Sequence, residues 1–238
     1  MKKAATSTSK TSSTSESESE TTSSSSSSSL SNSIINMSNT DIAAGLRQAL
    51  NLGIEDQVNK LTQPNGFYNN SLVKIMLPEE LEKVDSGLRS VGLGSLADEG
   101  IKVLNSAAED AVKEATPIFV NAVKGISFDD AKTILLGNDD AATVYLTDKT
   151  QLELYEKFQP IINQSFKKVG ADTVWNTIIT KYNSLPFVSK VNPDLTDYVT
   201  SEALNGVYIM IAVEEKEIRS STAARSTNLL QSVFKLQD

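Results

Sequence analysis

The side chains available for chemistry in this chain are limited by two absences. The 238 residues contain no histidine and no cysteine. Without imidazole, no side chain has an unperturbed pKa near neutrality, so neither a Ser-His-Asp nor a Cys-His nucleophile system can form. Zinc, haem and iron–sulfur sites of the usual kind need the same two residue types. The chemistry that remains is that of carboxylates, lysine, tyrosine and hydroxyls, or of a hard cation held by oxygen ligands.

Two glutamates are the candidates for carboxylate chemistry. Glu214 lies four residues after Met210 and four before Ile218, on the apolar side of a hydrophobic segment. A carboxylate there needs a partner or has a raised pKa, and we favour an ion pair with an arginine or lysine elsewhere. Glu109 follows two alanines, which allow close approach of another helix. If both acids face one cleft, they could act in a carboxylate-dependent hydrolase or lyase, or bind a proton or cation.

A second group of polar candidates follows the acidic run 137–140, Gly-Asn-Asp-Asp. Acids at this position favour capping of a helix start over a metal site, and the spacing of an EF-hand is absent. Thr143 and Tyr145 form a hydroxyl pair just beyond the run. Tyr145 and Lys149 share a helix face and could orient an anionic head group, although a half-buried tyrosine beside a solvated lysine is the commoner arrangement.

Glu215 and Arg219 complete the set of candidate site residues. They are four residues apart, the spacing of an ordinary helical ion pair worth about 0.2–0.5 kcal/mol when exposed. The segment Gly92-Leu93-Gly94 is not a nucleotide loop, because the third glycine and a preceding strand are missing. We therefore predict no metal site and no cofactor.

The composition divides the chain into a serine-rich tail, residues 1–37, and a domain, residues 38–238. Seventeen of the first forty residues are serine, and apolar side chains there are too few to offset chain entropy, which predicts disorder. The tail has three lysines and three glutamates, so the net charge of -8 belongs to the domain. An acidic domain disfavours nucleic acid as a partner. The tail suits a flexible tether to a membrane or surface, or it is a leader without consequence.

The pattern from residue 38 onward is that of an all-α domain with several helices, begun by hydroxyl or acidic residues and ended by glycines. Ser38, Ser95 and Ser127 each precede an aspartate by three residues, a variant of the capping box. The run 206–213 is apolar almost all round, which favours a central helix over a buried strand. Pro160 is expected to bend or divide a long helix that begins after residue 140.

Several segments together resemble a known family. They include Asn65-Gly66-Phe67, residues 75–78, Asn105 to Glu109, Asp140 to Thr143, and residues 214–219. These segments resemble the DUF4197 family, bacterial proteins of unknown function, and the resemblance covers nearly all of residues 41–236. It implies an α-helical domain that is usually made with a secretion signal or lipoprotein leader, and hence a location in the periplasm or at the outer membrane.

Met1-Lys2-Lys3 is not followed by the apolar region of a signal peptide, no lipidated cysteine is present, and no stretch approaches a membrane span, so the cytoplasm is the alternative location. We expect a non-catalytic binding or scaffold domain of the cell envelope that takes an apolar ligand, such as a lipid, or a protein partner. The alternative is the carboxylate-dependent enzyme described above.

Overall fold

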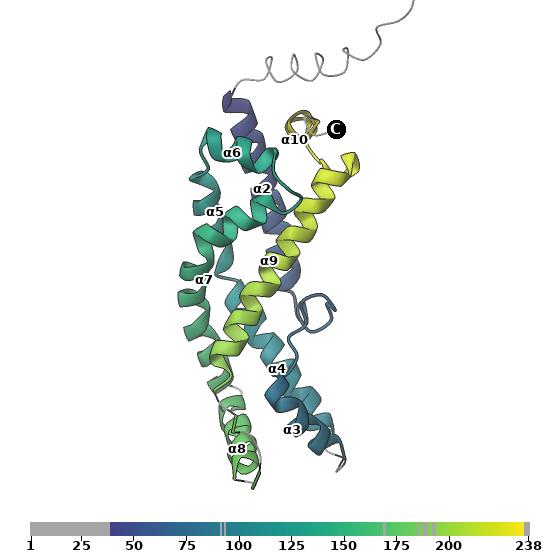
Figure 1. The fold of residues 1–238 in the computed structure, drawn as a ribbon, viewed down its shortest axis with the longest axis vertical. Helices are drawn as coiled ribbons and strands as arrows, with labels where there is room; N and C mark the ends of the chain where they lie inside the picture. Colours follow the sequence, from purple (N-terminus) through teal and green to yellow (C-terminus); the bar gives the residue numbers. More distant parts are fainter. Residues whose placement is uncertain are drawn as a thin grey trace, which may run out of the picture. The chain divides into compact units, whose positions relative to one another are not determined.

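The computed structural model describes residues 39–90, 92, 94–168, 170–184, 186–187, 190–191 and 194–235. Within these ranges the regular elements are helices and no strand occurs, which confirms the all-α prediction (Figure 1). The predicted tail, residues 1–37, lies outside the described residues. The helices are α2 (Asn39–Leu61), α3 (Glu79–Ser90), α4 (Gly94–Val112), α5 (Ala115–Lys124), α6 (Phe128–Leu135), α7 (Ala141–Lys168), α8 (Ala171–Asn183), α9 (Thr196–Ser220), the short 3-10 helix η1 (Thr222–Ala224) and α10 (Asn228–Phe234).

Helix α9 is central to the packing. It lies against α7, α4 and α2, and Figure 1 shows it crossing the view between α7 and α4. Its residues Val199, Ala203 and Val207 are fully buried. The run 206–213 is helical throughout, so the prediction of a central helix is confirmed. The polar helix formers on both sides of this run explain why it does not form a strand.

Helix α2 supplies a second part of the core. Its inward side chains recur at the spacing of one helix face and are all buried: Ile42, Leu46, Leu50, Val58 and Leu61. The helix packs on α5, α6, α9 and α10. Contact with α10 is close at Gly45, where an added Cβ would lie 2.5 Å from the Val233 side chain.

Of the three predicted capping boxes, one is confirmed, one is wrong and one lies outside the described residues. At α6 the box is present, because the Ser127 hydroxyl accepts from the Asp130 backbone N–H while the Asp130 carboxylate accepts from the Ser127 N–H. At Ser95 the prediction is wrong, since α4 begins one residue earlier and the Asp98 carboxylate instead accepts from Arg89 at 2.6 Å. Ser38 lies outside the described residues.

Pro160 does not divide the long helix, contrary to one of the two expectations for it. Helix α7 continues through it as a single element of 28 residues. A proline removes one hydrogen bond from a helix and crowds the preceding turn. Helix α7 packs against α4 and α9, and Phe158 and Ile162 on either side of the proline are fully buried, so tertiary packing favours a continuous helix.

One irregular segment matters for the site, and we call it the strap: residues 62–78, between α2 and α3. It lies along α9, where the Tyr198 hydroxyl donates to the Met76 carbonyl at 2.9 Å and the Asn70 amide contacts the Met210 sulfur at 3.3 Å. Phe67 of the strap is fully buried. It lies so close to α9 that a Cβ added at Gly206 would be 2.8 Å from its ring.

Candidate functional site

Two side chains of α4, one turn apart, hold the backbone of the strap. Asn105 is fully buried; its Oδ1 accepts from the Ile75 N–H and its Nδ2 donates to the Ile75 carbonyl, both at 2.8 Å. Glu109 accepts from the backbone N–H groups of Asn65 and Phe67, at 3.2 and 3.3 Å. The predicted site residue Glu109 therefore binds backbone amides and forms no ion pair among the described residues.

The strap begins with a tight turn at Asn65 and Gly66, and this turn presents the backbone N–H groups that bind Glu109. Asn65 has a φ of 64°, in the left-handed region that asparagine tolerates better than most residues. A Cβ added at Gly66 would lie 2.5 Å from the carbonyl oxygens of Lys60 and Leu61, so only glycine fits. Burial raises the pKa of Glu109, and the backbone N–H groups of Phe67 and Asn65 offset part of that rise.

A second polar cluster joins α6, α7 and α9 through Glu215. Its Oε2 accepts from the Thr143 N–H and hydroxyl, both at 2.8 Å, and its Oε1 from the Ala142 N–H at 2.8 Å. Arg219 pairs with the same carboxylate and donates to the carbonyls of Ile134 and Leu135. Thr143, Glu215 and Arg219 are thus brought together, and the pair expected as an ordinary helical ion pair is a buried one. Glu215 caps the start of α7 from another helix.

Glu214 is less buried than Glu215 and has a different kind of partner from the one expected. Its carboxylate accepts from the Gln57 amide at 2.6 Å, rather than from an arginine or lysine. Burial raises its pKa, and the nearby Lys60 charge offsets part of the rise. Glu214 and Glu109 share no hydrogen-bond partner, and neither lines the three cavities described below. The hypothesis of a paired-carboxylate cleft therefore receives no geometric support.

Tyr145 and Lys149 lie together, as their spacing predicted. The Lys149 ammonium is 5.6 Å from the centre of the half-buried Tyr145 ring. Both line an open cavity of about 420 Å³ between α5 and α7. Asp130 and Glu153 line it too, and their negative charges oppose the anionic head group that the pair was expected to orient.

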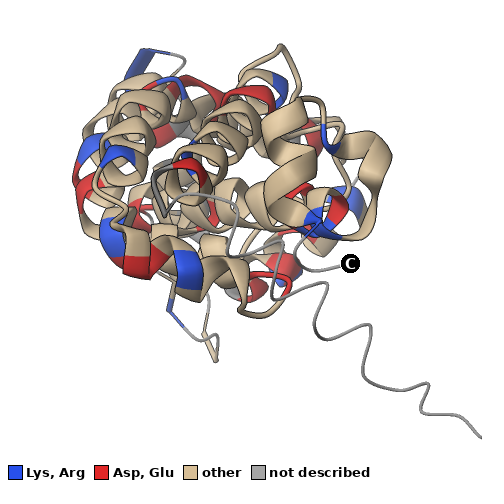
Figure 2. Cartoon of the chain, turned by 90° about the horizontal axis from the view of Figure 1, so that it is seen from above, with Lys and Arg blue, Asp and Glu red and all other residues tan. Residues whose placement is uncertain are grey.

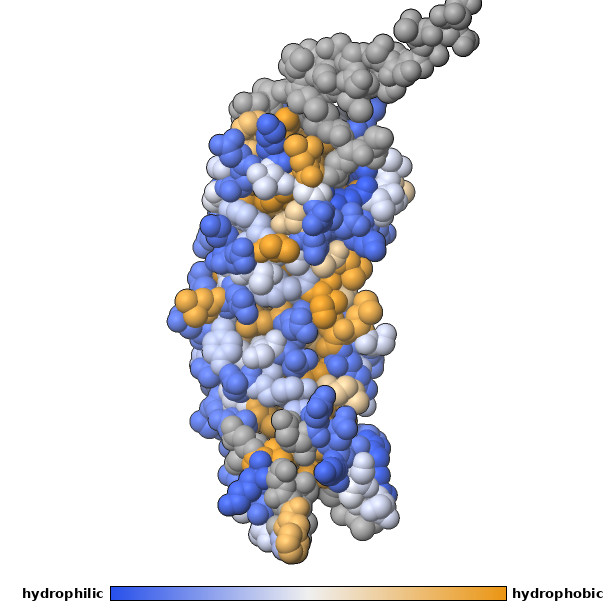
Figure 3. Space-filling view, in the orientation of Figure 1, coloured by the Kyte–Doolittle hydropathy of each residue, from blue (hydrophilic) through white to orange (hydrophobic). Residues whose placement is uncertain are grey.

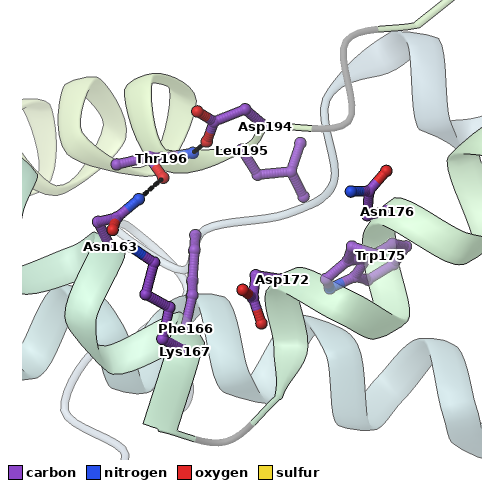
Figure 4. A pocket seen from close by; sticks show the side chains of 9 residues that line it. All are labelled: Asn163, Phe166, Lys167, Asp172, Trp175, Asn176, Asp194, Leu195 and Thr196. Carbon is purple, nitrogen blue, oxygen red and sulfur yellow. Dashed lines mark hydrogen bonds between the residues drawn. The ribbon is translucent and has the colours of Figure 1, made fainter.

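A cavity that the sequence pattern did not indicate lies where α7, α8 and the start of α9 meet (Figure 4). Its volume is about 230 Å³. The buried residues Phe166, Trp175 and Leu195 form its apolar floor. The remaining lining residues are polar: Asn163, Lys167, Asp172, Asn176, Asp194 and Thr196. The one available signal was Trp175, the only tryptophan of the chain, placed close in sequence to several amides and acids.

A third cavity, of about 340 Å³, lies between α4 and α7. Its lining includes Lys102, Lys168, Ser165 and Asp110. Burial alone would raise the pKa of Asp110, but hydrogen bonds from Lys113 and Ser165 lower it below its ordinary value. Within the part of the chain that the structure describes, no group of three or more acidic residues is placed to hold a metal ion.

The charged side chains of the described helices are mixed in sign. Figure 2 shows lysines and arginines interspersed with aspartates and glutamates rather than gathered on one face. No helix among the described residues is long and apolar enough to cross a membrane.

Comparison with known families gives a match over most of the chain. The model of DUF4197, described as a protein of unknown function, matches residues 36–235, and the chain belongs to this family. No curated protein and no solved structure matches the chain. The segments that carried the resemblance meet in pairs: Asn105 and Glu109 bind residues 65–67 and 75, and Glu215 binds residues 142–143.

Proposed function

We propose that this domain is a non-catalytic binding module that docks a protein partner through the strap. The observation that carries the proposal is that two buried polar side chains, Asn105 and Glu109, are used to fix the backbone of an irregular surface segment. Irregular segments held on a rigid scaffold are where proteins commonly place binding residues. Burying a carboxylate costs desolvation free energy, which hydrogen bonds must offset. We take this cost as support for a functional role of the strap.

The side chains that the strap exposes are of the kind that docks to proteins. Leu72 is 59% exposed and Met76 is 53% exposed, although both are large and apolar. Val213 of the neighbouring helix α9 is also exposed. Figure 3 shows hydrophobic residues gathered at mid-height on the right of the view, over the strap and α9. Exposed apolar side chains grouped on one face typically mark an interaction surface, and methionine adapts well to a partner's shape.

A protein partner suits this geometry better than an enclosed lipid. The three cavities open at the surface and carry charged or amide side chains, whereas a lipid carrier needs a largely apolar cavity. The enzyme alternative has less support, because Glu109 and Glu214 bind different segments and Glu215 is fully engaged by backbone N–H groups and Arg219.

Photo-crosslinking from the strap tests the proposal in the cells that make the protein. A photoreactive residue placed at Leu72 or Met76 is expected to capture one discrete polypeptide. The matched control is Leu152 on α7, which has the same side chain as Leu72 and is 73% exposed. Capture from both strap positions and not from position 152 supports the proposal; equal capture from all three, or none from the strap, contradicts it.

The cell envelope is the compartment we propose for this docking, on the strength of the family resemblance alone. Fractionation of cells that express the protein from its own gene, with its natural upstream sequence, tests this. Recovery with periplasmic or outer-membrane markers supports the envelope, and recovery with cytoplasmic markers contradicts it.

A further inference from the structure

A fully exposed aromatic side chain follows α8. Phe187 has a relative exposure of 106%, and the other large apolar side chains that the structure describes reach 73% at most. Its backbone φ is 66°, in the left-handed region that a bulky side chain rarely adopts. Pro186 beside it is exposed as well, and we call these two residues the α8 tip. A strained conformation persists only where the surrounding structure holds it, and such residues cluster at functional positions.

One side chain ties together the two ends of the chain around the α8 tip. Asn183, the last residue of α8, donates from Nδ2 to the Val191 carbonyl and accepts at Oδ1 from the Val191 N–H, both at 2.8 Å. Val191 is buried in the core. Asn105 holds Ile75 of the strap by the same pair of hydrogen bonds. Asn183 therefore fixes where the chain returns to the core, and the α8 tip lies outside it.

The charge near the α8 tip is positive, although the chain as a whole has a net charge of -8. Residues 173–193 contain two lysines, Lys181 and Lys190, and no aspartate or glutamate. The Lys190 side chain is exposed and, among the described residues, has no acidic partner within the distance of a salt bridge. Figure 1 shows α8 at the lower end of the view, and Figure 3, in the same orientation, shows hydrophobic surface at that end.

We propose that the α8 tip inserts into the interface of an anionic lipid bilayer. Phe187 enters the boundary between the head groups and the acyl chains, and Lys190 contacts the negative head groups. A protein interface surrounds an aromatic anchor with a wider apolar contact area, whereas the exposed neighbours Ser184 and Lys190 are small or charged. The acidic charge of the rest of the domain opposes the approach of its other faces to the same surface, which orients the contact.

Fluorescence of the full chain tests this insertion. Phe187→Trp places a reporter at the α8 tip, and Leu152→Trp, the matched control, places one at an exposed position of α7. Trp175 is buried and gives the same background in both. With vesicles that contain phosphatidylglycerol, we expect a blue shift and quenching by brominated acyl chains for Phe187→Trp and neither for Leu152→Trp. Vesicles of phosphatidylcholine alone are expected to bind about fivefold or more weakly.

The variant Phe187→Asn separates lipid binding from stability. Asparagine tolerates the left-handed region better than phenylalanine, so this variant is expected to be at least as stable in urea as the wild type. Its co-sedimentation with the phosphatidylglycerol vesicles is expected to weaken about tenfold or more, because the phenyl group is lost. Lys190→Gln is expected to weaken binding about fivefold, while Lys157→Gln, at an exposed lysine of α7, leaves it unchanged.

Three results overturn the proposal: no shift or quenching for Phe187→Trp, an equal response from Leu152→Trp, or full vesicle binding by Phe187→Asn. Capture of a polypeptide by a photoreactive residue at position 187, without vesicle binding, also overturns it and assigns the α8 tip to a protein partner. None of these results bears on docking through the strap, which involves other residues.

Discussion

Glu215 and Arg219 form a buried ion pair, with Oε1 of the carboxylate 2.8 Å from Nη2 of the guanidinium and only about 5% of each side chain exposed. The pair lies at the junction of three helices, since Glu215 also binds the first turn of α7 and Arg219 binds the last carbonyls of α6. The hydrogen bonds beyond the pair itself are what allow two charges to be buried there without a large net cost.

Replacing Glu215 with glutamine is expected to lower the free energy of unfolding by about 3 kcal/mol, because it leaves the Arg219 charge buried without its partner. The matched control is Glu214→Gln, the same change one residue earlier, where the partner is the neutral Gln57 amide. Urea denaturation at pH 7 measures both. Equal effects of the two substitutions would show that the Glu215 pair does not brace the fold.

Removing the Asn105 side chain is expected to release the strap. The substitution Asn105→Ala leaves both the N–H and the carbonyl of Ile75 unpaired, and a buried unpaired polar group costs about 1–3 kcal/mol. Hydrogen exchange measures the effect locally: the Ile75 amide is expected to exchange much faster, while amides in the middle of α9 keep their protection unless the whole domain is destabilised. Unchanged protection at Ile75 would mean that Asn105 does not anchor the strap.

Alanine is expected to have opposite effects at two glycines, one packed against the strap and one with open space around it. Gly206→Ala places a Cβ 2.8 Å from the buried Phe67 ring and is expected to destabilise by about 1–3 kcal/mol. Gly87→Ala, within α3 and with nothing inside 4 Å, is expected to stabilise by about 0.5–1 kcal/mol. Thermal or urea denaturation of the two variants checks the signs. A tolerated alanine at position 206 would indicate that the strap lies further from α9.

The pH dependence of stability follows from the raised pKa of Glu214. The pKa of Glu214 is raised above its ordinary value of 4.5, so the folded protein holds this proton more tightly than the unfolded chain does. The free energy of unfolding therefore falls as the pH rises from 4.5 through the raised pKa. Glu214→Gln removes that loss, and the stability of the variant relative to the wild type is expected to increase from pH 4.5 to pH 7. A relative stability that falls over this range would contradict the assignment.

Asp110 is expected to act in the opposite sense, because its pKa is lowered in the folded protein. The wild type therefore gains stability as the pH rises through the ordinary aspartate pKa of 3.8, and Asp110→Asn is expected to lose stability relative to the wild type over that rise.

The helical architecture was predictable because it depends on local patterns: the inward residues of α2, the apolar run of α9 and the capping box at Ser127 are all present. The roles of Glu214 and Glu215 were not, because the two are adjacent, and the orientation that buries Glu215 depends on where α7 begins against α9. The spacing of residues along one helix predicts which of them share a face. It does not predict which face the end of another helix will contact.

The strap and the cavity between α7, α8 and α9 also depend on contacts between distant segments, which local sequence patterns do not predict. Asn105 and Ile75 are 30 residues apart, and no local pattern indicates that one amide side chain pairs with both backbone groups of the other. The cavity brings side chains of α7 and α8 together with Asp194, Leu195 and Thr196. Tyr145 and Lys149, and likewise Glu215 and Arg219, are one turn apart on a single helix, and these are the pairs whose proximity the sequence predicted.

Native mass spectrometry of the protein isolated gently from its own cells is the most direct test of docking through the strap. The account predicts a complex with one discrete polypeptide for the wild type and for Leu152→Asp, and loss of that complex in the double variant Leu72→Asp, Met76→Asp. A bare mass in every case, a complex that survives the double variant, or a bound lipid in place of a second chain would contradict it.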